Sequence, residues 1–391
     1  MKKVVKFGGS SLASAEQFKK VGNIIRKEES RRYVIPSAPG KRTPDDTKVT
    51  DMLYSCYGQA ILGEDAEKDF EEQLEAIKER YNSIISGLDL ELSLDEEFKT
   101  IRTNFSKKIG RDYAASRGEY LNGIIMAAYL GYEFIDAAEV IVFDENGNFD
   151  GDKTHEILSA RLENTERAVI PGFYGAKPDG SIQTFSRGGS DITGSIVAKA
   201  VHADMYENWT DVSGFLIADP RIIKNPKPID VITYRELREL SYMGATVLHE
   251  DAIFPVRKEG IPINIRNTNA PEDKGTLIVE DTCRKPRFTI TGIAGKKDFA
   301  SITIEKAMMN SEVGFCRKVL EVFENNHISI EHMPSGIDTM TIFVHRDEFE
   351  EKEQDVIAGI HRAVEPDFLE LESDLALIAV VGLSLIHISE P

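Results

Sequence analysis

Short apolar runs alternate with amphipathic stretches through the first part of the chain. The run Val4–Phe7 is followed by two glycines and then by a helical pattern from Ala15 to about Lys27. A second apolar run, Tyr33–Pro36, ends in the small-residue turn 37–40. Strands that alternate with helices are typical of α/β folds built on a mainly parallel sheet. This pattern therefore predicts an α/β domain.

A highly charged stretch from Glu64 to about Lys108 carries apolar residues at helical spacing. They are Phe70, Leu74, Ile77, Tyr81, Ile84 and Ile85. We expect an amphipathic helical excursion here, with its charges on a solvated face. A further helix is predicted from Asp112 to Leu130, and another one up to about Ala200. Strand-like runs lie at 141–143, 168–170 and 182–185, and a glycine-rich segment lies at 187–191.

The pattern changes near 281–287, where a proline and several charged residues indicate a domain boundary. Beyond it, the sequence predicts strands at 288–294, 301–304, 328–330, 340–344, 369–371 and 375–381, and helices at 314–324 and 348–361. The β-α-β-β-α-β order within this stretch is ferredoxin-like. We therefore expect one domain over residues 1–285 and a regulatory or interaction region over residues 286–391, with flanking strands beside its compact module.

The chain has 391 residues, a net charge of −19 and a pI of about 5.0. A strongly acidic protein is a poor candidate for binding nucleic acid or an anionic membrane. An anionic substrate would need a local basic site against this overall field. The sequence has no apolar run of membrane-spanning length and no stretch of signal-peptide type. We expect a cytoplasmic protein without nucleic-acid or membrane partners.

The cysteines and histidines do not indicate a metal site. Cys56, Cys283 and Cys316 are odd in number and widely spaced, so neither a disulfide framework nor a zinc site is predicted. The histidines are scattered, without metal-ligand spacing. We therefore predict no metal site made by the protein alone.

The first segment with candidate chemistry is the glycine turn in Lys6–Ser11. A glycine pair after a strand lets the backbone approach a ligand closely, and the N-terminus of the following helix favours an anion. Lys6 adds a positive charge, so the segment suits a nucleotide phosphate. A plain structural turn explains the same residues, and the Walker pattern is not matched.

The second segment is Phe185–Thr193. Arg187 can grip a carboxylate with two parallel hydrogen bonds, and Asp191 can accept from an ammonium group. Ser190 or Asp191 can also cap the following helix. A zwitterionic amino acid needs such an arginine and such an acid. A capped helix with a surface ion pair is the structural alternative.

The third segment is Trp209–Gly214, together with 218–221. Thr210 and Asp211 can hydrogen-bond a nucleoside, and Arg221 can reach a phosphate. Ordinary turn chemistry explains these residues equally well, because Asp-Pro commonly opens a turn.

Taken together, these segments resemble the aspartate kinases of the amino acid kinase superfamily. The family opening Lys-Phe-Gly-Gly-(Thr/Ser)-Ser matches residues 6–11, and the Arg-Gly-Gly-Ser-Asp element matches 187–191. The Trp-Thr-Asp-Val-x-Gly element, with its later Pro-Arg, matches 209–221 in outline. Shorter matches lie at 118–119, 171–173 and 244–249. The resemblance covers about residues 2–382 and implies a three-layer sandwich with a mainly parallel central sheet.

The resemblance implies phosphorylation of the side-chain carboxylate of L-aspartate by ATP, with Mg²⁺ bridging the phosphates. This reaction is the first step towards lysine, threonine and methionine. The implied catalytic residues are Lys6 and Asp191. The implied ATP-binding residues are Lys6, Gly8, Gly9, Ser10, Thr210, Asp211, Leu216 and Arg221. The implied aspartate-binding residues are Ser37, Thr50, Glu119, Phe173, Arg187, Ser190 and Asp191.

Within the implied aspartate pocket, Arg187 would bind a carboxylate, and Glu119 and Asp191 would bind the ammonium group. Two positions depart from the family pattern. Thr246 stands where many members have lysine, and Leu216 stands where the family has tyrosine. The nucleotide contact of that lysine is therefore lost or supplied elsewhere, and stacking by residue 216 is not expected.

The C-terminal region resembles the paired ACT modules of these kinases, in which one module is inserted into the other. Residues 299–371 resemble the complete inserted module. Residues 288–294 and 375–382 resemble the first two strands of the other module. The tail 383–391 does not match the family, and we expect the second module to be incomplete.

ACT modules bind amino acids at their mutual interface, so the resemblance implies an effector site and a homodimer or homotetramer. The matching effector residues are Met309, Ser311, Gly314, Phe315, Glu331 and Ser335. The acidic residues Glu312, Glu331 and Asp338 favour lysine over threonine as the feedback inhibitor, with threonine as the alternative.

Two other hypotheses stay open. The chain can be another kinase of the same fold, or a non-catalytic amino-acid sensor. Glu119 and Asp191 favour a substrate with an α-amino group, which a nucleotide substrate such as UMP lacks. Lys6 and Asp191 are both retained, which argues against a sensor. No homoserine dehydrogenase segment is recognisable, so we expect a single activity.

Overall fold

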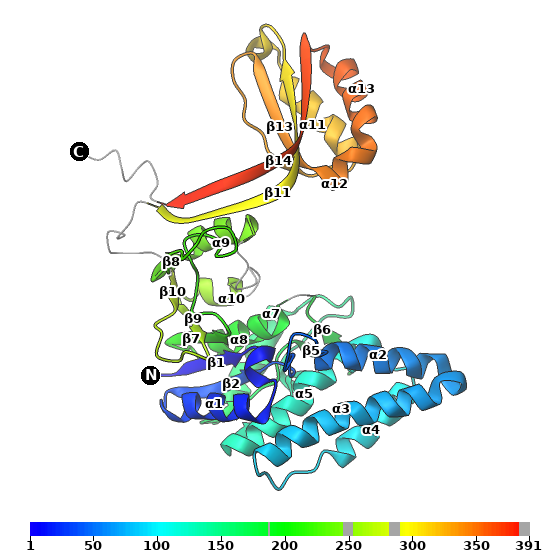
Figure 1. The fold of residues 1–391 in the computed structure, drawn as a ribbon, viewed down its shortest axis with the longest axis vertical. Coiled ribbons are helices and arrows are strands. Elements are labelled where there is room, and N and C mark those ends of the chain that lie inside the picture. The colour runs from blue at the N-terminus through cyan, green and yellow to red at the C-terminus, as the bar shows by residue number, and fades with distance from the viewer. Residues whose placement is uncertain (187, 245–252, 281–289, 383–391) are drawn as a thin grey trace, which may run out of the picture. The chain divides into compact units, whose positions relative to one another are not determined.

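The computed structural model describes the chain except for residues 187, 245–252, 281–289 and 383–391 (Figure 1). The chain divides into two compact units. The N-terminal unit holds Met1–Ser241, Thr246–Gly292 and Val381–Pro391, and the C-terminal unit holds Tyr242–Ala245 and Ile293–Val380. Among the helices that the structure describes, none is both long and apolar enough to cross a membrane.

An eight-stranded sheet forms the centre of the N-terminal unit, in the order β3-β4-β2-β1-β7-β9-β10-β8. Its strands are β1 (Lys3–Phe7), β2 (Arg31–Pro36), β3 (Glu133–Phe134), β4 (Ala168–Val169), β7 (Met205–Thr210), β8 (Val231–Thr233), β9 (Ile263–Asn267) and β10 (Thr276–Val279). All neighbouring pairs are parallel except β9 and β10, which are antiparallel. The prediction of an α/β fold with a mainly parallel sheet is confirmed.

The helices of this unit cover both faces of the sheet (Figure 1). They are α1 (Ala15–Arg26), α2 (Val49–Leu62), α3 (Glu67–Gly87), α4 (Asp95–Ser106), α5 (Arg111–Leu130), α6 (Ala137–Val140), α7 (Gly151–Leu162), α8 (Gly189–Ala200), α9 (Tyr234–Tyr242) and α10 (Phe254–Arg257). The described part of this unit also contains two short 3₁₀ helices, η1 (Gly9–Leu12) and η2 (Gly63–Ala66), and a small hairpin of β5 (Tyr174–Ala176) and β6 (Ile182–Thr184).

Residues along β1 alternate between two helical layers, as side chains of a strand must. Val5 and Phe7 belong to a buried apolar cluster with residues of α1 to α5. Lys6, between them, points to the opposite face and pairs with Asp191 of α8. The sheet therefore lies between two layers of helices, which is the three-layer sandwich that the family resemblance implies.

The charged stretch 64–108 is helical, as expected. Helices α3 and α4 fill most of it, and the apolar positions of α3 are buried in the cluster that also contains α1 and α5. Phe70, Leu74, Ile77 and Tyr81 are each at most 6% exposed. One charged residue of α3, Arg80, is buried as well, which the prediction of a solvated charged face did not foresee.

The C-terminal unit is a four-stranded sheet in the order β12-β13-β11-β14, with helices packed against it (Figure 1). Its elements are β11 (Ile290–Glu305), η4 (Met309–Ser311), α11 (Phe315–Asn325), β12 (Ile330–His332), β13 (Thr339–His345), α12 (Arg346–Phe349), η5 (Glu350–Lys352), α13 (Glu353–Val364) and β14 (Phe368–Gly382). Strand β13 pairs antiparallel with β11 and β12. The element order and the strand order are those of a ferredoxin-like fold, so this prediction is confirmed.

The flanking strands expected beside this module are not separate elements. The first two residues of the predicted strand 288–294 lie outside the described residues. Its remainder and the predicted strand 301–304 form one strand, β11, and the predicted strands 369–371 and 375–381 form one strand, β14. Asp298 (φ 69°) and Asp374 (φ 60°) have left-handed backbone inside these strands. Such a residue interrupts the two-residue alternation of a strand, and the pattern therefore divided each strand in two.

Candidate active site

The predicted site residues gather where parallel strands end. Strand β1 lies between β2 and β7 and is parallel to both. Gly8 follows β1, Ser37 follows β2 and Asp211 follows β7, so all three lie at the carboxyl edge of the sheet. The chain leaves β1 for β2 on one side and returns to β7 on the other. Such a switch point is where open α/β sheets bind ligands.

Lys6 and Asp191 form an ion pair at this edge. Lys6 Nζ lies 2.6 Å from Asp191 Oδ1, and the two side chains are 11% and 15% exposed. Asn208, on the neighbouring strand β7, donates from Nδ2 to the same oxygen at 2.9 Å. The structure thus brings the two predicted catalytic residues together, from β1 and from the first turn of α8.

The glycine turn packs tightly against the loop that follows β2. Gly8 N donates to Trp209 O at 3.0 Å, and Gly40 N donates to Gly9 O at 2.8 Å. A Cβ on Gly9 would lie 2.8 Å from Ala38 O, which is closer than real Cβ contacts. Ser10 is exposed. The turn therefore keeps glycines for close backbone contact and presents the next residue outward.

Phe173 and Ser190 lie side by side. A Cβ on Gly172 would be 2.6 Å from Ser190 Oγ, so the segment before Phe173 rests directly on the start of α8. Phe173 has a φ of 81°, and its N–H donates to Thr193 Oγ1 at 3.1 Å. A left-handed backbone at a non-glycine residue costs free energy and is frequent at functional sites. Arg187, predicted for the same pocket, lies outside the described residues.

Ser37, Thr50 and Glu119 come together around Ala38. Ser37 N donates to Phe7 O at 3.1 Å, which fixes it beside the end of β1. A Cβ on Gly118, next to Glu119, would lie 2.8 Å from Ala38 Cβ and 3.8 Å from Thr50 Oγ1. The loop after β2, the start of α2 and the middle of α5 are therefore in contact here.

Glu119 is a buried carboxyl group with unused hydrogen-bonding capacity. Its side chain is 6% exposed, and Oε2 has no hydrogen-bond partner among the residues that the structure describes. Burial raises its pKa to about 8, although the backbone N–H of Ala38 and the positive charges of Arg117 and Lys6 act in the opposite direction. A carboxylate in such a site gains most from a cationic hydrogen-bond donor. An amino group on a ligand would supply one.

The residues predicted for the nucleotide base and ribose are more dispersed. Thr210 ends β7, and its Oγ1 donates to Asp211 Oδ1 at 3.2 Å. Leu216 is 38% exposed, and its backbone pairs with that of Pro228 in a single antiparallel β-bridge. Arg221 is exposed, and its guanidinium donates to both carboxylate oxygens of Asp219. Thr210 and Asp211 thus lie at the carboxyl edge, whereas the fork of Arg221 is engaged within its own turn.

Sequence reasoning missed Asn208 and Asn122. Asn208 binds Asp191, and Asn122 of α5 donates from Nδ2 to Ser37 O at 2.6 Å. Both are buried. The available signal was a polar residue inside an otherwise buried element, since buried polar groups are retained where they are hydrogen-bonded.

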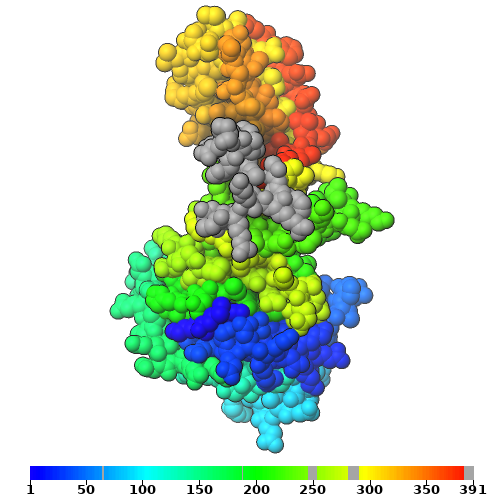
Figure 2. All heavy atoms as spheres, turned by 90° about the vertical axis from the view of Figure 1, so that its left-hand side faces the viewer, coloured from blue at the N-terminus to red at the C-terminus, as the bar shows by residue number. Residues whose placement is uncertain are grey.

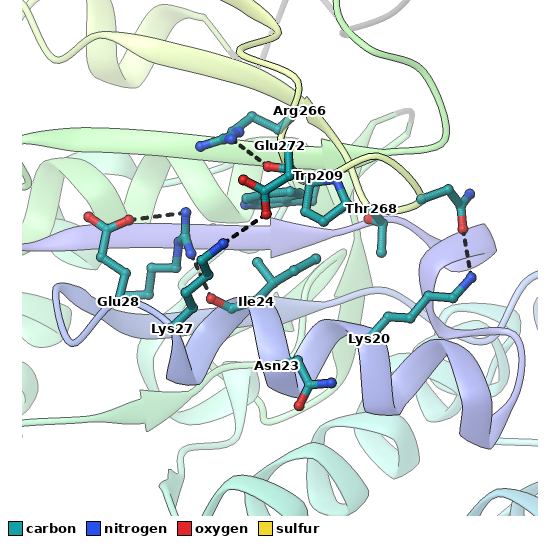
Figure 3. Close-up of a pocket in the computed structure, with 12 residues that line it drawn as sticks. Lys20, Asn23, Ile24, Lys27, Glu28, Trp209, Arg266, Thr268 and Glu272 are labelled. Carbon is teal, nitrogen blue, oxygen red and sulfur yellow. Dashed lines mark hydrogen bonds and ion pairs between the residues drawn. The ribbon is translucent and has the colours of Figure 1, made fainter.

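A cavity of about 640 Å³ lies elsewhere, on the opposite face of the sheet from Asp191, between α1 and the chain that follows β9. Figure 2 shows the blue atoms of the first helix beside the yellow-green atoms of that chain. Lys27 and Glu272 are joined by an ion pair over Trp209 and Ile24 (Figure 3). No residue predicted for catalysis, aspartate or ATP lines this cavity, so it is separate from the candidate active site.

Five of the six predicted effector residues lie at one end of the C-terminal unit. Ser311 donates from Oγ to Met308 O, Gly314 precedes α11, and Met309 and Phe315 are buried. Two hydrogen bonds, from Met308 N to Asp338 Oδ1 and from Asn310 N to Ile337 O, join this loop to the turn before β13. Ser335 forms a bridge with Met340 at the same turn.

Glu331 does not join this group. Its Oε1 lies 3.4 Å from Nε2 of His345. His345 ends β13, whereas the turn at Asp338 precedes the start of this strand. The acidic residue Glu312 is paired with Lys306 and Lys318, at 2.8 and 2.7 Å. Lys306 and Lys318 therefore neutralise Glu312, one of the acids that favoured lysine as the effector.

The amino acid kinase family model matches residues 1–267. The chain is 40% identical to aspartokinase 3 of Bacillus subtilis, over 98% of this chain and 87% of that protein. It is 26% identical to the lysine-sensitive aspartokinase 3 of Escherichia coli, over 84% of this chain and 75% of that protein. The crystal structure of Clostridium acetobutylicum aspartate kinase, described as an allosteric enzyme, is similar with a TM-score of 0.87 and 52% identity, over 97% of this chain and 86% of that one.

These matches extend over nearly the whole chain and include both compact units. They agree with the three-layer sandwich, the ferredoxin-like unit and the ion pair at the carboxyl edge of the sheet. The chain therefore belongs to the amino acid kinase family and, within it, to the aspartokinases, phosphotransferases with a carboxyl group as acceptor.

Proposed function

We propose that residues 1–285 transfer the γ-phosphoryl group of ATP to the side-chain carboxylate of L-aspartate, which gives 4-phospho-L-aspartate. The observation that carries this proposal is the buried carboxyl group of Glu119, with its unpartnered oxygen, near the charge of Lys6. Such a carboxylate needs a cationic donor. Of the substrates of this fold, an amino acid with a free α-ammonium group supplies it.

In this proposal the substrate ammonium group binds Glu119 and Asp191, and Arg187 binds a substrate carboxylate. Ser190 and Phe173 border the same space, since they lie side by side at the start of α8. Ser37 and Thr50 close it from the loop after β2 and from α2. Fixing the substrate at both of its charged ends directs its free carboxylate toward the phosphate. Such positioning is the main source of catalysis in phosphoryl transfer.

The nucleotide phosphates bind the backbone of Gly8, Gly9 and Ser10, and the nucleoside lies near Thr210 and Asp211. Lys6 offsets the negative charge that develops on the transferred group. Its ion pair with Asp191 fixes the cation, and a Cβ on Gly8 would lie 3.7 Å from Lys6 Nζ, so the cation lies beside the glycine turn. Leu216 and Arg221 border the nucleoside, with Arg221 free to exchange its exposed pairing with Asp219 for a phosphate.

Mg²⁺ would be held in this site together with ATP. Within the part of the chain that the structure describes, no three His, Cys, Asp or Glu residues are grouped to hold a metal ion. An ion that is bound mainly through phosphate oxygens and water, as Mg²⁺ is in phosphoryl-transfer enzymes, does not need such a group of protein ligands. When bound, the ion would supply positive charge that offsets the charge of the phosphates.

We further infer that residues 286–391 form a regulatory region that inhibits the kinase when lysine binds, with threonine as the alternative effector. The ferredoxin-like unit supports this inference, as does the lysine sensitivity in the name of the Escherichia coli relative. Met309, Ser311, Gly314, Phe315 and Ser335 would form the effector site. Because Glu331 lies at the far end of β13, it would contribute from a second module or a second subunit.

The enzyme would then act in the cytoplasm as a homodimer or homotetramer and open the pathway to lysine, threonine and methionine. Light scattering coupled to size-exclusion chromatography measures the subunit number directly. A monomeric mass at assay concentration would remove the second subunit from this account.

The decisive experiment traps the acyl phosphate with hydroxylamine in the presence of Mg-ATP. Hydroxamate that requires L-aspartate supports the kinase, and a decrease with lysine supports the effector. Activity that lysine and threonine both leave unchanged would reject the regulatory inference while keeping the kinase. A folded protein that makes no hydroxamate with aspartate would reject the proposed substrate.

A further inference from the structure

One buried arginine connects the helical excursion to the active-site loops. Arg80 of α3 is 4% exposed. Its Nη2 donates to Gly40 O at 2.8 Å and to Ala13 O at 3.2 Å, and its Nη1 donates to Asp46 Oδ2 at 2.7 Å. One planar guanidinium therefore ties three chain segments together: α3, the chain that follows the glycine turn, and the loop that follows β2.

The contact continues from Gly40 to the glycine turn. Gly40 accepts from Arg80 through its carbonyl oxygen, and its N–H donates to Gly9 O at 2.8 Å. A Cβ on Gly40 would lie 2.6 Å from the carbonyl carbon of Gly9, so the two backbones touch without space for a side chain. The position of Gly9 is thus set by Gly40, and the position of Gly40 is set by Arg80.

Asp46 closes the loop that Arg80 holds. Its carboxylate accepts from the backbone N–H of Arg42 at 2.9 Å and from both arms of the Arg42 guanidinium. These bonds, followed by the contact with Arg80, hold the pKa of Asp46 well below its usual range. The carboxylate is therefore charged at neutral pH, and the loop 40–46 is folded around it.

A core can be stabilised without a buried arginine that donates to two backbone carbonyls and one carboxylate. Apolar residues of similar volume usually stabilise a core at least as well as a buried ion pair does. A guanidinium has a rigid planar fork, so it fixes the relative positions of its acceptors, which a flexible point charge such as lysine does not. This geometry suits a part of the protein in which loop position matters for chemistry.

We propose that Arg80 is a positioning residue for phosphoryl transfer: it holds Gly40 against Gly9 and thereby sets the backbone that receives the ATP phosphates. The proposal rests on the phosphate-binding role of the glycine turn stated above. It also gives the helical excursion 64–108 a function, because α3 carries the anchor for both loops. Arg80 itself does not touch substrate and acts only through Gly40.

The test compares Arg80→Lys with Arg102→Lys in the full chain. Arg102 pairs with Glu71 on the exposed side of the same excursion, at 56% and 40% exposure, and is the matched control. For Arg80→Lys we expect ADP affinity at least about tenfold weaker and kcat/KM for Mg-ATP lower by about 100-fold, because small displacements of positioning groups have effects of that size. For Arg102→Lys both values should stay within about twofold of wild type.

Hydrogen exchange gives a readout of loop position that does not depend on activity. Peptides that span residues 7–14 and 38–48 should exchange faster in Arg80→Lys, whereas peptides of β7 should be unchanged. If Arg80→Lys does not fold, Asp46→Asn replaces it. It keeps the size of the side chain and removes its charge, and the same changes are expected with smaller amplitude.

Two results would overturn the proposal. One is a folded Arg80→Lys, or Asp46→Asn, that binds ADP and turns over as the wild type does. The other is unchanged exchange in both loop peptides. Failure of the wild-type protein to bind ADP or to form aspartyl hydroxamate would instead reject the proposed function, so the two failures are distinguishable.

Discussion

Lys6 Nζ and Asp191 Oδ1 are 2.6 Å apart, which joins the end of β1 to the first turn of α8 across the carboxyl edge of the sheet. Neither side chain is more than 15% exposed, and Asn208 binds the same carboxylate oxygen. In the proposed mechanism, Lys6 is neutralised by this pair until a phosphate arrives, and Asp191 then becomes available for a second cation. We therefore expect the pair to link the binding of nucleotide to the binding of an amino group.

Replacing Lys6 by methionine should remove the cation without changing the packing volume much. We expect kcat to fall by about 100- to 1,000-fold, the range seen when one preorganised charge-stabilising donor is removed. Aspartate-dependent hydroxamate formation at saturating Mg-ATP measures this loss. A variant with more than about a tenth of wild-type kcat would exclude Lys6 from the chemical step.

Stability separates the chemical role of Lys6 from its structural role. Lys6→Met leaves Asp191 with Asn208 alone, so we expect a loss of about 1–3 kcal/mol in the free energy of unfolding. The double variant Lys6→Met/Asp191→Asn removes both charges and should recover most of that stability. It should remain inactive, because the lost catalysis does not depend on the uncompensated carboxylate.

If Glu119 binds the substrate ammonium group as proposed, aspartate binding should depend on pH. Its pKa is raised to about 8 in the free protein, so the carboxyl group still holds its proton over much of the neutral range. A bound ammonium group favours the carboxylate and lowers this pKa. Aspartate binding should therefore release protons at about pH 7, and the KM for aspartate should fall as the pH rises from about 6 to about 8.

Calorimetric titrations of aspartate in two buffers of different ionisation enthalpy measure the released protons. Glu119→Gln should abolish the release and weaken aspartate binding, while ADP binding stays unchanged. The raised pKa also affects stability. Between the unfolded pKa of 4.5 and the folded pKa of about 8, only the folded state keeps the proton of Glu119, so the free energy of unfolding should decrease as the pH rises through this range. Equal proton release by wild type and Glu119→Gln would assign the release to another group.

The sequence predicted the elements around the site because the local pattern changes period there. The switch from a two-residue to a helical period located β1, the glycine turn and α1, and the small-residue turn located the end of β2. The pairing of Lys6 with Asp191 could not be derived locally, since 185 positions of chain separate them. The family motifs named both residues as catalytic, but their pairing is a finding of the structure.

Arg80 shows what a local pattern leaves out. It lies between Ile77 and Ile84 at helical spacing, on the same buried stripe. A charged residue among these apolar positions indicated a buried charge, but the many charged residues of the stretch 64–108 favoured the prediction of a solvated helix face. Two acceptors of Arg80 are the carbonyl groups of Ala13 and Gly40, and backbone carbonyls carry no sequence signal. The third is the carboxylate of Asp46, which lies 34 positions away in the chain, beyond the reach of a local pattern.

Gly9 and Gly40 should not tolerate alanine. Each Cβ would lie 2.6–2.8 Å from backbone atoms of the other loop, which side-chain motion cannot relieve. We expect Gly40→Ala to lower kcat/KM for Mg-ATP by at least about 100-fold through displacement of the turn. Gly58→Ala is the matched control, because this exposed position in α2 has nothing within 4 Å. It should keep full activity and stabilise α2 by about 0.5–1 kcal/mol.

Glu207 anchors the centre of the sheet rather than the active site. Its carboxylate is fully buried and accepts from Lys3 at 3.0 Å, Arg31 at 2.8 Å and Trp209 Nε1 at 2.9 Å. Burial alone would raise its pKa, but the hydrogen bonds and charges of Arg31 and Lys3 outweigh burial and lower it. Glu207→Gln would leave two buried cations with one carboxylate fewer, and we expect a loss of about 3–5 kcal/mol.

Trp209 is the single tryptophan and touches this network, so its fluorescence during urea unfolding measures the effect. Lys27→Ala, which breaks an exposed pair with Glu272, should change stability by less than about 0.5 kcal/mol. Because the pKa of Glu207 is lowered by folding, its contribution is present above the unfolded value near 4.5 and is lost as the pH falls below it. On acidification, the wild type should therefore lose stability more steeply than Glu207→Gln does. If the free energies of unfolding of the two proteins fall in parallel with pH, the charge of Glu207 does not stabilise the sheet.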